Sequence, residues 1–207
     1  SKSAGSDIVR VRVSPWAPLQ AKKLIFLSCA NNLWRGSYKD LIDLMQIDKC
    51  SIAFIGLGEA ASAIISGFGS KRNKQVQAFD IKLQSNDTRE EIISRGRMLN
   101  ICIKLTLDEM IKEADIIFST VTADQAFAVA KEASSYLKKG AYFFDLNSCA
   151  PSSKQKAFKI IHSSGGSYVD VAVMTPVYPK KNLVPLLISG DNIAQANLIL
   201  EKIPMNA

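Results

Sequence analysis

The sequence predicts an α/β fold, with a doubly wound, mainly parallel sheet that follows an N-terminal extension. Three observations support this fold class. The apolar run 52–55 leads into the glycine pattern Gly56-x-Gly58-x-x-Ala61. From Glu59 onward, apolar residues recur with helical spacing. Strand-like and helix-like segments then alternate over roughly 140 residues, an order typical of parallel sheets. Together these features predict a Rossmann-type domain.

Residues 1–47 fit this pattern poorly and are assigned to an extension without a functional motif. Valine and arginine alternate over 9–13, which is typical of a half-buried strand. Residues 23–29 are a candidate second strand, and 37–46 have the spacing of a short amphipathic helix. We expect the dinucleotide-binding domain to occupy residues 48–207.

Short apolar runs bounded by turn residues predict the strands of this domain. The predicted strands are 51–55, 75–81, 101–103, 115–120, 141–145, 168–173 and 184–189. Pro185 stands near the start of the last strand, and it cannot donate a ladder hydrogen bond. An edge position is therefore expected for that strand.

Amphipathic spacing and start signals predict the helices. The predicted helices are 59–68, 88–97, one beginning at Thr106, 122–137, 151–162 and 192–203. Thr106 and Thr122 each stand three residues before a Glu or Gln, which is the spacing of a capping box. Pro151 suits the first turn of a helix, where its missing N–H is not needed.

The glycine pattern between the first strand and the first helix has the residue types of a dinucleotide-binding turn. Gly56 allows a sharp turn, Gly58 lets a pyrophosphate approach the main chain, and Ala61 is small enough for helix–strand packing. The helix start offers unpaired N–H groups to phosphates. A tight turn in another kind of α/β protein is the alternative. The candidate cofactor residues here are Gly56, Leu57, Gly58, Glu59, Ala60 and Ala61.

A second part of the cofactor signal lies at the end of the second strand. Asp80 stands 22 residues after Gly58, close to the spacing expected for an acid that binds the adenine ribose. Its negative charge would repel a 2′-phosphate, so NAD is predicted over NADP. Lys82 and Arg89 are near enough to reach a phosphate, which keeps NADP open. Ile81 joins Asp80 as a candidate contact, and a solvated strand end is the alternative.

Composition limits the classes of partner. The formal net charge is +7, yet basic and aromatic residues do not interleave as they do in proteins that stack nucleotides. The cluster Lys154, Lys156 and Lys159 is interpreted as solvated surface. No apolar run approaches the roughly 18 residues of a membrane span. The four cysteines are isolated, which favours free thiols in a reducing cytosol. We expect a cytoplasmic protein without nucleic-acid, membrane or metal binding.

Four motifs occur in an order that resembles a known superfamily. They are FIGLGEAASAIISGF, FSTVTADQA, DLNSCAPSSKQ and DVAVMTPVYPKKNLVPLLISG. In this order they resemble the N-terminal NAD-binding domain of the β-hydroxyacid dehydrogenases, which include 3-hydroxyisobutyrate and 6-phosphogluconate dehydrogenases. The resemblance covers residues 50–203. It implies a nicotinamide cofactor and a small anionic substrate.

The resemblance also implies roles for two loops. Thr120 and Val121 are expected to pack against the nicotinamide ribose, and Gln125 stands where relatives carry a cofactor-binding amide. Asn147 and Ser148 are expected to contact substrate, with Ser148 also near the nicotinamide. As neutral donors at a helix start they suit a carboxylate. Capping roles are the alternatives for Gln125 and Ser148.

The sequence departs from the superfamily in two places. Relatives carry a substrate-binding Ser-Gly-Gly where this chain has Met174, Thr175 and Pro176. Only Thr175 keeps a hydroxyl suited to a substrate. The superfamily's general acid/base lysine lies on a helical second domain, which we expect to be absent from a chain that ends at Ala207. No catalytic residue is therefore assigned.

Two functions follow from these expectations. The first is the NAD(P)-binding part of an oxidoreductase that transfers a hydride between the cofactor and a small β-hydroxy acid or a related substrate. The alternative is a non-catalytic dinucleotide-binding module, truncated or regulatory. Because the helical domain of relatives usually carries the dimer interface, a homodimer is the assembly that the resemblance implies.

Overall fold

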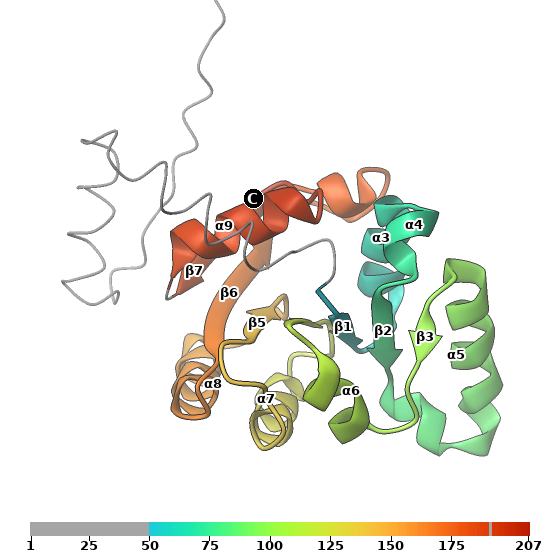
Figure 1. The fold of residues 1–207 in the computed structure, drawn as a ribbon, viewed down its shortest axis with the longest axis horizontal. Helices are drawn as coiled ribbons and strands as arrows, with labels where there is room; N and C mark the ends of the chain where they lie inside the picture. Colours follow the sequence, from blue (N-terminus) through green and yellow to red (C-terminus); the bar gives the residue numbers. More distant parts are fainter. Residues whose placement is uncertain (1–49, 191) are drawn as a thin grey trace, which may run out of the picture.

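The computed structural model describes residues 50–190 and 192–207 and contains a seven-stranded sheet with helices on both faces (Figure 1). The strands are β1 (Ile52–Ile55), β2 (Val76–Phe79), β3 (Cys102–Ile103), β4 (Ile116–Ser119), β5 (Tyr142–Asp145), β6 (Ser167–Val173) and β7 (Leu186–Gly190). Their order is β3-β2-β1-β4-β5-β6-β7. All neighbouring pairs are parallel except β6 and β7. This confirms the predicted fold class.

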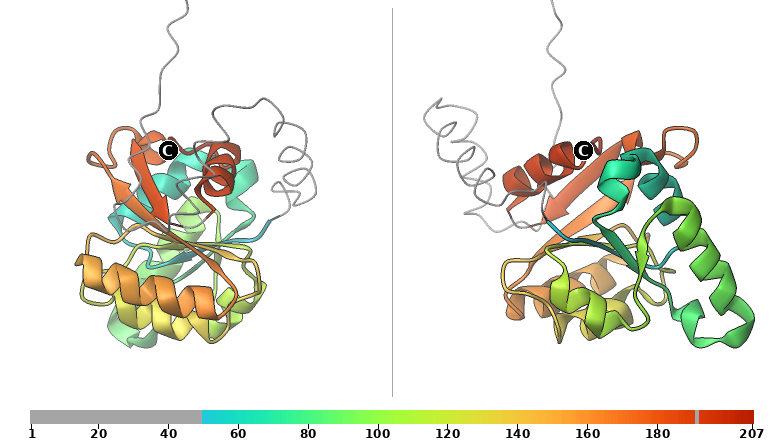
Figure 2. Two further views of the ribbon diagram at one scale, coloured as in Figure 1. Left: turned by 90° about the vertical axis from the view of Figure 1, so that its left-hand side faces the viewer. Right: turned by 45° about the vertical axis from the view of Figure 1, so that its right-hand side comes forward.

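The helices form two layers around the sheet. They are α3 (Glu59–Phe68), α4 (Ser70–Asn73), α5 (Asn86–Leu99), α6 (Leu107–Glu113), α7 (Ala126–Ser134), α8 (Pro151–Ser163) and α9 (Ile193–Lys202). Two 3₁₀ helices, η3 (Ile81–Gln84) and η4 (Lys181–Leu183), complete the described elements. Figure 1 and Figure 2 show α3, α4 and α9 on one face and α6, α7 and α8 on the other. The strand and helix expectations within 1–47 lie outside the described residues.

Several predicted boundaries were wrong for local reasons. The helix expected from Thr122 begins at Ala126. The side chains of Thr122 and Gln125 both hydrogen-bond to the Asp124 carboxylate, so no capping box forms there. Thr106 does precede α6, but its side chain bonds to the Asp108 carboxylate and does not cap the backbone.

The second and last strands also differ from their predicted ranges. β2 ends at Phe79, because the Asp80 side chain accepts a hydrogen bond from the Lys82 N–H (3.0 Å) and starts η3. β7 begins after Pro185 and forms the end of the sheet, which confirms the edge position predicted from that proline.

Aromatic rings form the centre of the core. Phe54, Phe118 and Phe144 lie on the adjacent strands β1, β4 and β5 and are fully buried. Their rings stack in sequence, with centroids 4.9 Å and 5.1 Å apart. Burial of such side chains stabilises the fold by about 1.5–3 kcal/mol each. The short apolar runs are thus strands covered by helices on both sides.

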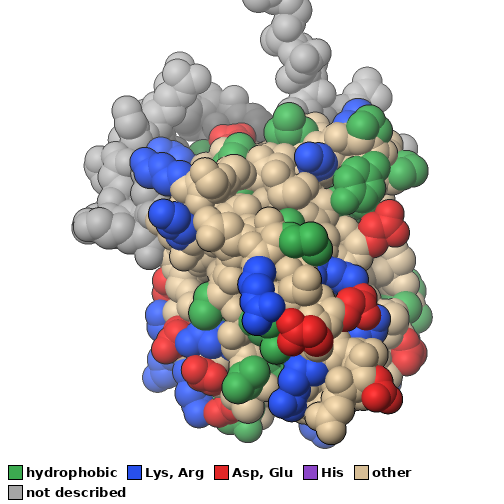
Figure 3. Space-filling model, turned by 90° about the vertical axis from the view of Figure 1, so that its right-hand side faces the viewer, with side chains coloured by type: hydrophobic (Ala, Val, Ile, Leu, Met, Phe, Trp, Pro, Cys, Tyr) green, Lys and Arg blue, Asp and Glu red, His purple; other side chains and the backbone are tan. Residues whose placement is uncertain are grey.

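The described surface carries both signs of charge. Figure 3 shows basic and acidic side chains interspersed on the side of the molecule that includes α5. Mixed charge of this kind creates no strong single-sign field on that face. Within 50–190 and 192–207, no helix is long and apolar enough to cross a membrane.

Candidate functional site

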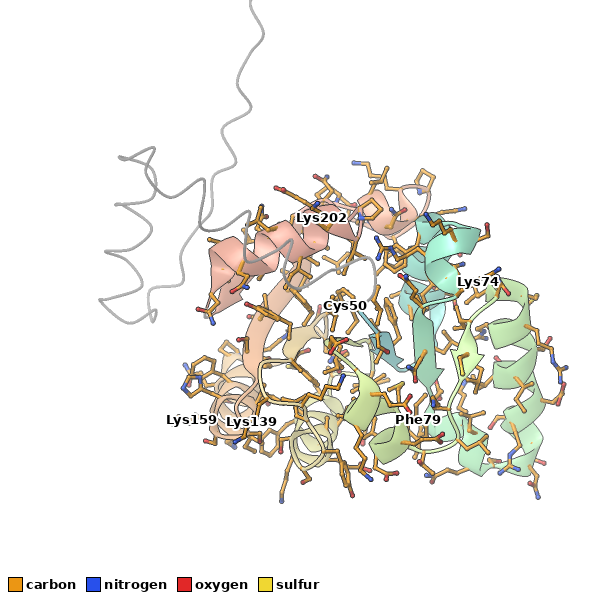
Figure 4. The ribbon with its side chains drawn as sticks, in the orientation of Figure 1. Cys50, Lys74, Phe79, Lys139, Lys159 and Lys202 are labelled. Atoms are coloured by element: carbon orange, nitrogen blue, oxygen red, sulfur yellow. The ribbon has the colours of Figure 1, made fainter. Side chains whose placement is uncertain are left out.

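Parallel pairing brings the carboxyl ends of β1, β2, β4 and β5 to one edge of the sheet. Ile55 aligns with Phe79 on one side and with Ser119 on the other, and Ser119 aligns with Asp145. Figure 4 labels Phe79, the last residue of β2, at this edge of the sheet, and Cys50, which precedes β1, at the opposite edge. The residues that follow these strand ends include most of the predicted site. Such an edge is where ligands bind in open α/β sheets.

Gly56 turns the chain out of β1 where no other residue fits. Its φ is +88°, and a Cβ there would lie 2.6 Å from the carbonyl oxygen of Thr120. Its N–H donates to Phe79 O at 2.8 Å, so the turn continues the ladder between β1 and β2. The close approach of β4 therefore requires the glycine that the sequence predicted here.

Gly58, at the start of α3, differs from Gly56 because the space around its Cβ position is open. A Cβ at this position would have no atom of the described residues within 4 Å. Gly58 is the N-cap of the ten-residue helix, and it has no side chain to accept hydrogen bonds from the first turn. Ala61 is fully buried behind this turn, whereas Glu59 is exposed. The first turn thus presents backbone N–H groups and the positive end of the helix dipole to open space.

Asp80 directly follows β2, and its carboxylate stabilises the glycine turn through a hydrogen bond. One carboxylate oxygen accepts a hydrogen bond from the Leu57 N–H at 2.8 Å, and the other accepts from Lys82 N–H at 3.0 Å. Each carboxylate oxygen has a further lone pair for a ligand hydroxyl. Ile81 is 65% exposed beside it. Asp80 therefore stabilises the conformation of the turn and can still accept hydrogen bonds from a ligand.

Two arginines of α5 contact the segments around the site, Arg95 at the glycine turn and Arg89 at η3. Arg95 donates from Nη1 to Leu57 O at 2.5 Å, whereas Asp80 accepts from the N–H of the same residue, so both side chains stabilise the turn. Sequence reasoning missed Arg95, because nothing local relates it to a turn 38 residues earlier. Arg89 donates to Leu83 O at 2.8 Å and is otherwise exposed.

The loop after β4 packs against the glycine turn. The Thr120 hydroxyl donates to Gly56 O at 2.8 Å, and Val121 Cγ1 lies 3.1 Å from the position of a Gly56 Cβ. Both residues are partly exposed at the sheet edge. Gln125 is exposed, and its amide donates to Asp124 at 2.8 Å. Thr120 and Val121 thus join the turn, while Gln125 faces its own loop.

Asn147, which follows β5, is a buried residue that links two strand ends. It is 5% exposed, and its amide nitrogen donates to Ser119 Oγ (2.9 Å) and Asp145 Oδ1 (2.7 Å). Because a carboxylate only accepts, the nitrogen must face Asp145. Both amide hydrogens are therefore engaged, whereas the amide oxygen is buried and has no hydrogen-bond partner among the described residues. Contact of Asn147 with a substrate stays a prediction. Ser148 beside it is exposed.

A charged cluster supports this loop, and sequence reasoning missed it. Lys154, on the first turns of α8, is 12% exposed and lies 3.1 Å from Asp145 Oδ1 and 2.9 Å from Asp170 Oδ1. Tyr168 donates to Asp145 Oδ2 at 2.6 Å, and its burial next to that carboxylate raises the pKa of the phenol. Lys154 is therefore not the solvated surface that its lysine cluster suggested. Its helical spacing to the buried Ala157 and Ile161 was the available signal.

Thr175 lies beyond β6, on the segment that departs from the superfamily pattern. Its side chain is exposed, and its hydroxyl is 3.4 Å from Pro176 O. Met174 beside it is 57% exposed.

Cys149 follows Ser148 directly in the chain and carries a thiol that could act as a nucleophile. Burial raises the pKa of this thiol. A raised pKa disfavours the thiolate, which is the nucleophilic form of the group.

Comparison with known proteins identifies the domain. Residues 51–202 match the family described as the NAD binding domain of 6-phosphogluconate dehydrogenase. The chain belongs to this family. The chain thus contains an NAD-binding domain of the 6-phosphogluconate dehydrogenase type, as the sequence motifs predicted.

Individual relatives agree with this assignment. The chain is 30% identical over 151 residues to an uncharacterized 28.5 kDa protein of Methanothermus fervidus, covering 73% of this chain and 54% of that protein. A conserved hypothetical protein from Sinorhizobium meliloti is 32% identical, with a TM-score of 0.72, and 76% of this chain covers 52% of it. The 3-hydroxyisobutyrate dehydrogenase of Mycobacterium tuberculosis, solved with L-serine, shares the fold at 17% identity and a TM-score of 0.64, covering 74% of this chain and 52% of that one. The chain therefore spans about half the length of these relatives.

Proposed function

We propose that the intact protein is an NAD-dependent oxidoreductase that transfers a hydride between the nicotinamide and a small β-hydroxy acid or a related carbonyl or imine compound. This chain supplies the cofactor-binding half. The observation that carries the proposal is the open first turn of α3 at Gly58, with the Asp80 carboxylate directly beside its glycine turn.

The residues present fit a dinucleotide. The pyrophosphate would lie against the backbone N–H groups that follow Gly58. Any side chain at position 58 would occupy the space through which the pyrophosphate approaches, and glycine leaves that space open. Asp80 would accept hydrogen bonds from the adenine-ribose hydroxyls through its remaining lone pairs. Its charge disfavours a 2′-phosphate, which supports NAD over NADP.

The reacting end of the site would lie along the same sheet edge. Thr120 and Val121 would contact the nicotinamide ribose, with Ser148 and Thr175 as exposed hydroxyls for an anionic substrate. When bound, the nicotinamide supplies the hydride chemistry. Hydride transfer also needs a group to move the alcohol proton. We assign that role, and the interface of a homodimer, to the helical domain that the superfamily resemblance implies for the intact protein.

The cofactor proposal is tested by fluorescence titration of the intact protein with NADH and NADPH. We expect tighter binding of NADH. Gly58→Ala should weaken NADH binding by about 10-fold, or ~1.4 kcal/mol, without a change in melting temperature, because the added methyl enters open space. Ser66→Ala, at the far end of α3, is the matched control. Absence of binding by both cofactors, or full affinity in Gly58→Ala, would refute the proposed site.

The reaction is tested by following NADH absorbance of the intact protein with panels of β-hydroxy acids, keto acids and imines. Turnover with one of these classes supports the oxidoreductase. If NADH binds and every panel is inert, the protein is a dinucleotide-binding module without this activity.

A further inference from the structure

The loop after β5 and the segment after β6 carry the two exposed hydroxyls of the proposed substrate site, and a single side chain connects the end of β5 to the middle of β6. Lys154 Nζ lies 2.9 Å from the carbonyl oxygen of Asp145, 3.1 Å from its Oδ1 and 2.9 Å from Asp170 Oδ1. Asp145 ends β5, and Asp170 is its register partner on β6. The three hydrogens of the ammonium group thus match three acceptors on two strands.

The same carboxylate determines the conformation of the loop. Asp145 Oδ1 accepts from the Asn147 backbone N–H (3.0 Å) and from its amide nitrogen (2.7 Å), in addition to Lys154. Tyr168 occupies the other oxygen. Asp145 is 1% exposed, so its charge depends on these donors for compensation. Loss of Lys154 would weaken the anchor from which the loop to Ser148 extends.

We propose that Lys154 is a positioning residue, which fixes the end of β5, and through it the Ser148 loop, against β6 in the relative orientation that hydride transfer requires. Its amine is bound between two carboxylates, so it does not replace the superfamily's general acid/base lysine. The identity of the substrate site rests on the proposed function. The statement that Lys154 positions the loop after β5 does not depend on that function, because all its contacts lie within this chain.

Hydrogen exchange of the intact protein tests the structural part without any ligand. In Lys154→Met, amides of 146–150 and 171–175 should exchange at least about 10-fold faster, while those of α3 remain unchanged. Lys154→Arg should restore most of the protection, since it keeps the charge. Lys159→Met is the matched control on the same helix, because Lys159 is exposed at the outside of the molecule (Figure 4). Asp170→Asn removes one arm of the bridge and serves if Lys154→Met does not fold.

Two probes test the functional part. ADP-ribose shares every part of NADH except the nicotinamide, so its Kd should change less than about 2-fold in Lys154→Met, whereas the Kd of NADH should rise about 10-fold because a displaced loop misplaces the ring. A purely structural loss would weaken both probes equally.

The outcomes separate the two proposals. Unchanged exchange at 146–150 in Lys154→Met, or an equal increase that includes α3, would overturn the positioning role. Equal loss of NADH and ADP-ribose would also overturn it. If the unaltered protein binds neither probe, the proposed function fails, and the exchange data alone decide whether Lys154 positions the loop.

Discussion

At the scale of single residues, two glycines of one turn are required for opposite steric reasons. Gly56 has a positive φ and faces the Thr120 carbonyl at a distance that leaves no room for a methyl group. Gly58 has ordinary backbone angles and faces open space. The first glycine is therefore needed by the fold, and the second by the ligand that we propose.

Gly56→Ala is expected to unfold at lower urea concentration than the unaltered protein. The positive φ alone costs about 1–2 kcal/mol for a residue with a Cβ, and the clash with Thr120 O adds to it. Gly140→Ala is the matched control, because Gly140 has φ +80° but open space around its Cβ position. Equal losses of unfolding free energy in the two variants would show that the clash with β4 contributes nothing.

Asp80→Asn is expected to change the preference between cofactors. The substitution removes the negative charge that opposes a 2′-phosphate and keeps one acceptor oxygen for the Leu57 N–H. The ratio of NADPH to NADH affinity should rise by about 10-fold, or ~1.4 kcal/mol, as measured by parallel titrations. Glu132→Gln, an exposed carboxylate on α7, provides a control for net charge. A preference of the unaltered protein for NADPH would contradict the role given to Asp80.

At the scale of elements, α3 is positioned by what packs on its last turn. Gly67 lies against Asn182 of η4, whose side chain would overlap any Cβ at that position. Asn182 is buried, and its amide donates to Pro204 O at 2.7 Å. This contact joins the cofactor helix to the C-terminal segment that follows α9. Neither Gly67 nor Asn182 carries a sequence signal for it.

Gly67→Ala is expected to destabilise the protein, against the helix propensity of alanine. Alanine in a helix is ordinarily favoured over glycine by about 0.5–1 kcal/mol, but overpacking against Asn182 should cost about 1–3 kcal/mol. Urea unfolding of Gly67→Ala, Asn182→Ala and the double variant measures the coupling. The double variant should be more stable than the two single losses predict. A gain of stability in Gly67→Ala alone would contradict the contact.

At the scale of the whole molecule, one core extends across the parallel strands. Three stacked phenylalanines on β1, β4 and β5 connect the first half of the sheet to the second. Because Phe118 is the middle ring, both halves depend on it. The same strands are followed directly by Gly56, Thr120 and Leu146, so the core that stabilises the fold also aligns the site.

Phe118→Ala is expected to lower the unfolding free energy by about 3–5 kcal/mol, since it leaves a cavity between two rings. Chemical denaturation monitored by circular dichroism provides the measurement. Met98→Ala, which truncates a side chain that is 78% exposed, should change stability by less than about 0.5 kcal/mol. A loss below about 1 kcal/mol in Phe118→Ala would show that the neighbouring rings refill the space.

Much of this molecule could be predicted from its sequence because the signals are local. The buried strands are continuous apolar runs, Gly56 is recognisable from its neighbours, and Pro185 predicted the edge strand. The predicted helix boundaries were wrong where a side chain made a hydrogen bond other than the predicted cap, as Thr122 does with Asp124. Competing hydrogen bonds of this kind decide helix starts and are not visible in spacing alone.

The sequence by itself determined the order of strands and helices, the dinucleotide turn and the family, since each depends on residue types within a short stretch. Only the tertiary structure decided that Asn147 is buried and that Lys154 joins Asp145 to Asp170. Those contacts exist because a crossover through α8 places β6 beside β5 in a particular register. A spacing pattern cannot encode which of several exposed-looking polar residues meets a buried carboxylate on a neighbouring strand.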